Sequence, residues 1–130
     1  MFREKTGIPS NDTKLLLEAG FLLREMSRFK EAAAVFDGCI GLLPNSEVPM
    51  VGLATTYLQA SKHERALEIS LMAVESFPES SYARLHYGEA LLFCGKPKEA
   101  RDQLLRVISM DPGSPFSDTA EKIIQTAGLA

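Results

Sequence analysis

The stretch that decides the fold is residues 63–112, HERALEISLMAVESFPESSYARLHYGEALLFCGKPKEARDQLLRVISMDP. Here one proline and one alanine each recur after 34 residues, and both series extend one step further toward the N-terminus. The two series are Pro44, Pro78 and Pro112, and Ala32, Ala66 and Ala100. Because two independent positions keep one interval, we infer that a structural unit of 34 residues occurs three times along the chain.

Aligning the units on their prolines divides the chain into residues 13–46, 47–80 and 81–114. The eighth place of each unit holds a small residue, namely Gly20, Ala54 or Gly88, and the twentieth is always alanine. Small residues there let two antiparallel helices approach closely, since a larger side chain would overpack the contact. The proline at place thirty-two ends the second helix, because its ring removes a donor and clashes with the preceding turn.

Each unit is therefore expected to form two helices. The predicted helices cover residues 13–26, 29–42, 47–60, 63–76, 81–94 and 97–110. Ser61 and Glu64 have the spacing of a capping box at the start of the fourth helix, and Ser27 precedes the second helix in the equivalent place. Pro97 is acceptable in the first turn of the sixth helix.

Both ends of the chain differ from the repeated units. Residues 1–12 contain glycine, proline, serine, asparagine and aspartate without a helical period, so we expect a flexible arm that ends in an N-cap at Asp12. Residues 115–130 follow Ser114 and carry apolar residues at helical spacing, with Gly128 as a stop signal. An amphipathic helix of this kind suits a terminal cap, which covers the last apolar surface of a repeat array.

The pattern resembles the tetratricopeptide repeat, which has a small residue at place eight, an aromatic at eleven, alanine at twenty and proline at thirty-two. Place eleven holds Leu23, Tyr57 and Leu91. The aromatic of place four is missing, since Leu16, Met50 and Arg84 stand there. The resemblance covers residues 13–114 and implies an all-α, right-handed superhelix of three repeats plus a capping helix. It also implies a non-enzymatic module that binds another polypeptide.

Composition is compatible with one ordinary globular domain. The chain has 130 residues, 45% of them apolar, and a net charge of −3. A nucleic-acid-binding domain usually carries a basic surplus, so we expect no nucleic acid as partner. No apolar run approaches the roughly 20 residues that a membrane span needs. The N-terminal residues lack a hydrophobic stretch, so we expect no secretory signal and a cytoplasmic location.

The reactive side chains do not suggest chemistry. Cys39 and Cys94 are far apart in sequence, which favours reduced thiols over a disulfide or a metal site. We expect neither His63 nor His86 to have a metal-binding partner one helical turn away. Because nucleophile-elbow, P-loop and dinucleotide motifs are also missing, we predict no enzyme activity, no metal and no cofactor.

In repeats of this type the first helix of each pair lines the inner groove through places two, five, nine, twelve and thirteen. The corresponding residues are Lys14, Leu17, Phe21, Arg24, Glu25, Val48, Val51, Thr55, Leu58, Gln59, Tyr82, Leu85, Glu89, Leu92 and Phe93. Nine of these fifteen are apolar or aromatic, and contiguous apolar surface usually marks an interaction site. The alternative is that a tight superhelix or a shifted register buries several of them in the core.

One branch of the family binds a C-terminal carboxylate with Lys, Asn and Arg side chains at places five and nine. Those places hold Leu17, Phe21, Val51, Thr55, Leu85 and Glu89 here, so this clamp is absent. A groove of this composition suits an amphipathic helix or an extended apolar segment. By size, repeat number and groove character the chain also resembles type III secretion chaperones, especially those that hold needle subunits with a small co-chaperone.

Two other roles remain open at this stage. The chain could be a scaffold or adaptor subunit, or a segment of a longer repeat protein, that joins two partners through its groove and its convex face. A regulatory subunit of an enzyme is a third possibility. The partner, the oligomeric state and the organism do not follow from these residues.

Overall fold

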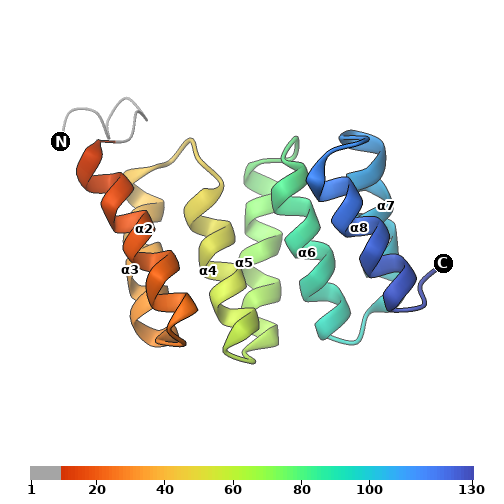
Figure 1. The fold of residues 1–130 in the computed structure, drawn as a ribbon, viewed down its shortest axis with the longest axis horizontal. Helices are drawn as coiled ribbons and strands as arrows, with labels where there is room; N and C mark the ends of the chain where they lie inside the picture. Colours follow the sequence, from red (N-terminus) through yellow and green to blue (C-terminus); the bar gives the residue numbers. More distant parts are fainter. Residues whose placement is uncertain (1–9) are drawn as a thin grey trace.

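The structure is a computed structural model that describes residues 10–130, and within this range it is entirely helical. The seven helices are α2 (Asn11–Glu25), α3 (Phe29–Leu42), α4 (Val48–Gln59), α5 (His63–Ser76), α6 (Ser81–Phe93), α7 (Pro97–Met110) and α8 (Pro115–Thr126). Each helix packs mainly against its neighbours in sequence (Figure 1). This architecture confirms the predicted all-α helical-repeat superhelix.

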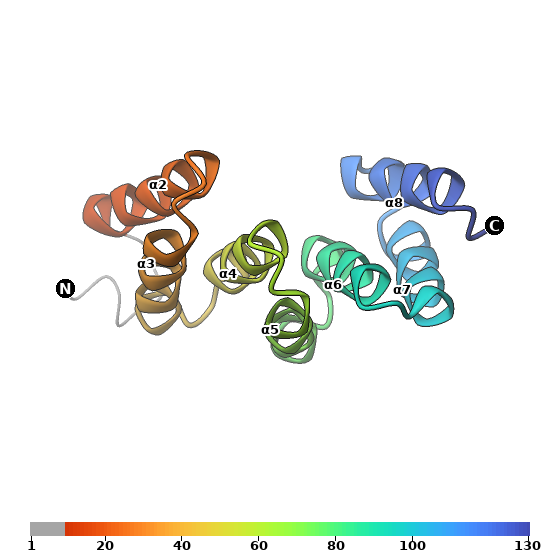
Figure 2. The same cartoon turned by 90° about the horizontal axis from the view of Figure 1, so that it is seen from below.

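The helices form two layers that curve together. Figure 2 shows α3, α5 and α7 on one side, and α2, α4, α6 and α8 on the other. Helices α2 and α8 stand forward at the two ends, while α4 and α6 lie between them. The first helices of the pairs therefore line a concave face, and the second helices form the convex side.

The alanines that revealed the repeat are at the tightest contacts. Ala32, Ala66 and Ala100 are fully buried, as the 34-residue period predicted. Glycine serves the same purpose beneath Phe36, because a Cβ added at Gly52 would lie 2.6 Å from the Cε1 of that ring. Such close approach explains why small side chains recur at fixed places along this chain.

The repeated prolines lie in turns that separate the helix pairs. Each follows the C-cap residue of a second helix, as in the sequence Leu43-Pro44 after α3. The Ser46 N–H then donates to the Leu43 carbonyl at 3.2 Å, and the same turn recurs after α5 and α7. Proline suits the second position of such a turn because its ring presets φ.

The first helix begins earlier than predicted. Ser10, not Asp12, is the N-cap of α2, and its hydroxyl accepts a hydrogen bond from the Thr13 N–H at 3.1 Å. Asp12 instead lies in the first turn, where its negative charge favours the helix N-terminus. Residues 10–12 are therefore not part of an arm, and the rest of the predicted arm lies outside the described residues.

The capping box predicted at Ser61 and Glu64 was wrong. Ser61 has a φ of 62°, the left-handed conformation that ends α4, and the N-cap of α5 is Lys62. The Lys62 N–H donates to the Tyr57 carbonyl at 2.9 Å, which is the longer bond of a Schellman motif. Ser27 has the same φ in the turn after α2. The turn inside each pair is too short to accommodate a separate cap for the second helix.

Replacing Ser61 by glycine is expected to raise the free energy of unfolding by about 0.5–1 kcal/mol. The left-handed conformation costs an L-residue roughly 1–2 kcal/mol, and the greater entropy loss of glycine offsets only part of this. Gly95 occupies the equivalent turn of the third pair with a φ of 74°. Gly95→Ser is the matched control, and urea unfolding should show a loss of similar size. A Ser61→Gly variant less stable than wild type would contradict this account of the turn.

The last helix covers the end of the repeat array. Ser114 caps it through a bond from the Ser117 N–H at 3.0 Å, and Gly128 ends it with a φ of 67°. The buried side chains Ala120 and Ile124 belong to the same cluster as Leu85, in the core between α6, α7 and α8. The polar face of α8 remains exposed, as a terminal cap requires.

Candidate functional site

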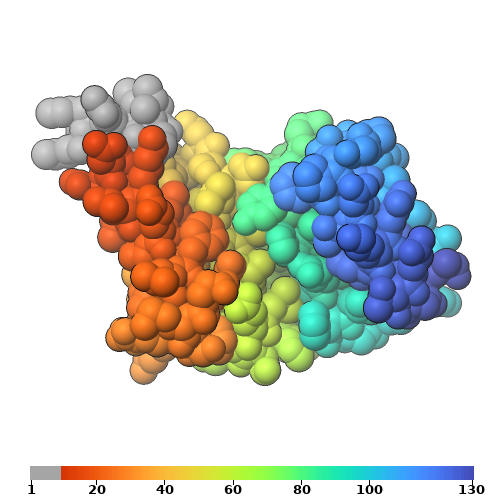
Figure 3. Space-filling view, viewed as in Figure 1, coloured from red at the N-terminus to blue at the C-terminus, as the bar shows by residue number. Residues whose placement is uncertain are grey.

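The concave face contains a pocket of about 390 Å³ between α2, α4 and α6. Figure 3 looks onto this face, which is hollowed between the forward walls formed by α2 and α8. The residues that line the pocket are Arg24, Thr55, Leu58, Gln59, Tyr82, His86, Glu89 and Phe93. Seven of these eight are among the fifteen groove positions derived from the sequence, and His86 is the addition.

Two apolar residues expected in the groove are core residues instead. Val51 is only 1% exposed and packs with Ala73 and Ala83, while Leu85 is 4% exposed in the cluster beneath α8. Helices α4 and α6 have neighbours on both sides, so place five of these helices turns toward the adjoining pair. Neither side chain offers a surface to a partner.

The other predicted groove residues retain some exposure, with one exception. Thr55 is buried, although it forms part of the pocket wall. Leu17 and Phe21 are half-buried and pack against the cluster around Phe36, so they belong partly to the core. Val48, Leu58, Tyr82, Leu92 and Glu89 are also half-buried, while Lys14, Glu25 and Gln59 are exposed.

Phe93 is the most accessible aromatic side chain of the pocket. It is 58% exposed at the end of α6, and its ring centroid lies 5.1 Å from that of His63. Leu92, the residue before it, lines a shallow hollow between α6 and α8 together with Ile123. The apolar part of the groove therefore lies toward the C-terminal ends of α4 and α6.

Arg24 brings a positive charge into the same pocket. Its Nη1 donates to the Thr55 Oγ1 at 2.5 Å, and its guanidinium carbon lies 5.1 Å from the centre of the Phe21 ring. The Thr55 hydroxyl in turn donates to the Gly52 carbonyl at 3.0 Å. This chain of contacts connects α2 to α4 and holds the cation against the groove wall.

The opposite wall, formed by α6, carries an acid and a base. His86 Nδ1 and Glu89 Oε1 are paired one helical turn apart. The expectation that His86 lacks such a partner was wrong, although the spacing of three residues is visible in the sequence. The Tyr82 ring stacks edge-on against His86 with a centroid distance of 5.2 Å. Burial raises the pKa of the Tyr82 hydroxyl above its usual value, and Arg24 opposes part of this rise.

The site offers little to a metal ion or a covalent reaction. Across residues 10–130, no third His, Cys, Asp or Glu joins the His86–Glu89 pair to form a metal-binding group. Both cysteines are free thiols. Burial raises the pKa of Cys39 and of Cys94, so neither is activated as a thiolate. What the groove can offer is shape, apolar surface and one charge of each sign.

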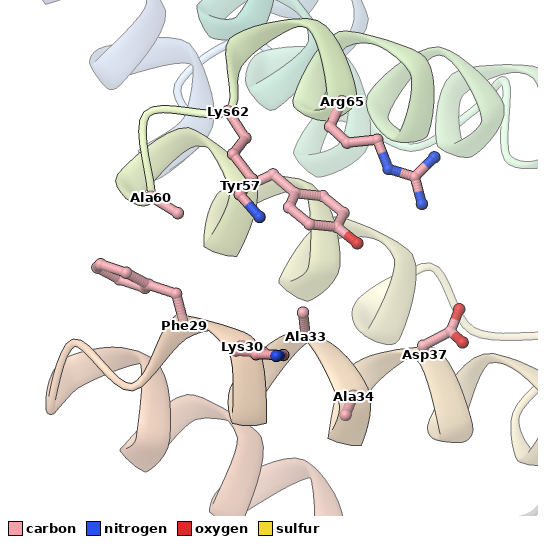
Figure 4. Close-up of a pocket in the computed structure, with 9 residues that line it drawn as sticks. All are labelled: Phe29, Lys30, Ala33, Ala34, Asp37, Tyr57, Ala60, Lys62 and Arg65. Carbon is pink, nitrogen blue, oxygen red and sulfur yellow. The ribbon is translucent and has the colours of Figure 1, made fainter.

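A second pocket, of about 310 Å³, lies between α3, α4 and α5 (Figure 4). Its walls include Phe29, Tyr57 and the basic residues Lys30, Lys62 and Arg65. The guanidinium carbon of Arg65 lies 5.4 Å from the centre of the Tyr57 ring. Because α3 and α5 form the convex side, this pocket faces away from the groove.

Solved structures of other proteins share this architecture. The first tetratricopeptide-repeat domain of Spaghetti (RPAP3), bound to the HSP90 peptide SRMEEVD, superposes with a TM-score of 0.74 at 21% identity. The match covers 92% of this chain and 96% of that one. The chain has the tetratricopeptide-repeat fold. No protein-family model matches it.

Two secretion-chaperone structures share the repeat fold as well. PcrH from Pseudomonas aeruginosa superposes with a TM-score of 0.81 at 16% identity, covering 92% of this chain and 95% of that one. The Yersinia enterocolitica type III secretion chaperone SycD, in complex with a peptide of the translocator YopD, gives 0.78 at 17% identity. That match covers 93% of this chain and 95% of SycD. At these identities the likeness establishes the repeat fold alone.

No helix within residues 10–130 combines the length and the apolar character needed to cross a membrane.

Proposed function

We propose that this repeat domain is a non-enzymatic, chaperone-like module that holds an apolar or amphipathic helical segment of another protein in its concave groove. The observation that carries the proposal is the pocket between α2, α4 and α6, where Leu58 and the exposed Phe93 lie on a concave surface. Repeat folds use such surfaces to bind extended or helical segments.

The expected strength of binding follows from the number of apolar anchors. Each well-buried side chain of leucine or phenylalanine size contributes about 1.5–3 kcal/mol. Two or three anchors would therefore support micromolar affinity after the costs of association. The peptide complexes of the Spaghetti domain and of SycD are consistent with a peptide in this groove, and they concern those proteins.

The test uses a displayed library of 16-residue peptides in which Leu, Ile or Phe occupies helical positions i, i+4 and i+7 and the other positions are random. We expect the wild-type protein to retain peptides at micromolar affinity. Phe93→Glu and Leu58→Glu should each weaken the selected peptides at least tenfold, because each places a charge in a contact that excludes water. Fluorescence anisotropy measures the affinity.

Met72→Glu is the matched control, because Met72 is an exposed apolar residue on α5, outside the pocket. It should bind the selected peptides like wild type. If no peptide is retained, or if Met72→Glu weakens binding as much as Phe93→Glu does, the groove proposal is wrong.

The type III secretion role is the finer part of this proposal. Under it, the groove would shield an aggregation-prone helix of a client in the cytoplasm until export, with a small co-chaperone as a possible second partner. The expectation favoured needle subunits as clients, whereas the SycD structure contains a translocator peptide. Suppression of client aggregation, followed by light scattering, tests this role.

A scaffold or adaptor is the second candidate, and the pocket on the convex side favours it. Lys30, Lys62 and Arg65 surround aromatic side chains there, on a face that a groove ligand would leave free. Simultaneous binding of two different partners would support the scaffold role, whereas competition between them would argue against it.

A further inference from the structure

We propose that the groove selects partner segments that carry an acidic side chain beside an apolar anchor, and that Arg24 receives the carboxylate. This inference rests on the proposed function, because it specifies the chemistry of the segment that the groove holds. It concerns a side-chain carboxylate within the segment, received by a single residue of α2.

The first observation is that the Arg24 cation is largely withdrawn from water. Its side chain is 17% exposed, and the Phe21 ring covers one face of the guanidinium. Thr55 satisfies Nη1, but the buried Nε has no hydrogen-bond partner. A guanidinium that has lost water without gaining a full set of partners binds an anion more strongly than an exposed one does.

The second observation is that this cation lacks a close counter-charge. Glu25 Oε1 lies 3.8 Å from Arg24 Nη2, which is too long for a hydrogen bond, and the Glu25 side chain is 70% exposed. Solvent screens such a pair, so it contributes little. In the part of the chain that the structure describes, no other carboxylate oxygen lies within 4.0 Å of this guanidinium.

The third observation is the distribution of charge across the pocket. Arg24 is on the α2 wall, and Glu89 is on the α6 wall, where it is paired with His86. A partner carboxylate would be attracted to the first wall and repelled by the second. With Leu58 and Phe93 in the same pocket, an acidic residue and a nearby apolar residue could both be satisfied in one orientation of the segment.

A carboxylate at Nη2 would form a charge-assisted hydrogen bond, stronger than a bond between neutral groups. Lysine could not replace the arginine fully, since it lacks the planar fork that also bonds Thr55. The acidic residue thereby adds selectivity to a surface that otherwise recognises only apolar bulk.

The experiment scans the peptides selected from the library described above. Each position of a selected peptide is replaced in turn by Glu, Gln, Lys and Ala, and the affinity is measured for wild-type protein, Arg24→Gln, Arg24→Glu and Glu89→Gln. Circular dichroism establishes folding. Arg28→Gln is the matched control, because Arg28 is an exposed arginine paired with Glu31 outside the pocket.

At one position, wild type should bind the Glu peptide at least tenfold more tightly than the Gln peptide. Arg24→Gln should abolish this preference, and Arg24→Glu should favour Lys at that same position. Glu89→Gln should increase the preference for Glu at least twofold, because it removes the repelling charge. Arg28→Gln should bind like wild type.

Equal affinity for Glu and Gln peptides at every position would overturn this inference while the proposed function still stood. A Glu preference that survives in folded Arg24→Gln would also overturn it. If Arg24→Gln does not fold, Glu89→Gln decides, and an unchanged preference for Glu contradicts the inference. Failure of the library to yield any peptide would overturn both proposals.

Discussion

Removing residues 115–130 is expected to abolish the single cooperative unfolding transition and to cause aggregation. Helix α8 covers Leu85, Leu104 and Val107, which are buried in the intact protein. Without it this apolar surface would face water, and exposed patches of that kind promote association. In a repeat array the end repeat depends on its cap, so the loss should spread into the third pair.

The measurements are urea unfolding followed by circular dichroism and light scattering of the truncated protein. Ile124→Ala is the milder companion, with an expected loss of about 2–5 kcal/mol from the cavity it leaves. Glu121→Ala, on the exposed face of α8, should change stability by no more than about 0.5 kcal/mol. A truncated protein that stays monomeric with an unchanged transition would show that α8 is dispensable.

The substitution Leu85→Glu is expected to unfold the protein, with a loss of about 4 kcal/mol or more. Leu85 is buried among Leu104, Val107 and Ile124, and no cationic side chain belongs to this cluster. An ionised carboxylate there would be desolvated without a partner, which is among the costliest changes a core can receive. Loss of helical circular dichroism at neutral pH is the readout.

Phe93→Glu is the matched control for this prediction, because it places the same charge on the same helix at an exposed position. It should leave the free energy of unfolding within about 1 kcal/mol of wild type, since surface substitutions have small effects. A folded Leu85→Glu variant of near-normal stability would return Leu85 to the groove, as the sequence pattern first suggested.

The alternating capping of the helices shows where local sequence is ambiguous. Ser61 followed by Glu64 has the spacing of a capping box, yet the same serine closes the preceding helix in a left-handed conformation. The choice depends on how many residues the turn must span between two packed helices, and that distance is set by tertiary contacts. Ser114 and Ser10 are true caps because they follow no helix so closely.

The sequence by itself determined the repeat and its physical basis. Ala32, Ala66 and Ala100 are buried because two helix backbones meet there, and the three prolines end helices wherever they occur. Steric requirements of this kind depend only on the residue and its immediate neighbours along the helix. They therefore appear directly as a period in the chain.

Only the tertiary structure decided which residues face the groove. Val51 and Leu58 were both expected on the inner face of α4, but Val51 is in the core and Leu58 lines the pocket. The curvature of the superhelix decides this, because it sets how far each helix turns toward the next pair. The partnership of Arg24 with Thr55 likewise joins residues 31 positions apart. Such a contact depends on how two pairs stack, which no pattern within one repeat specifies.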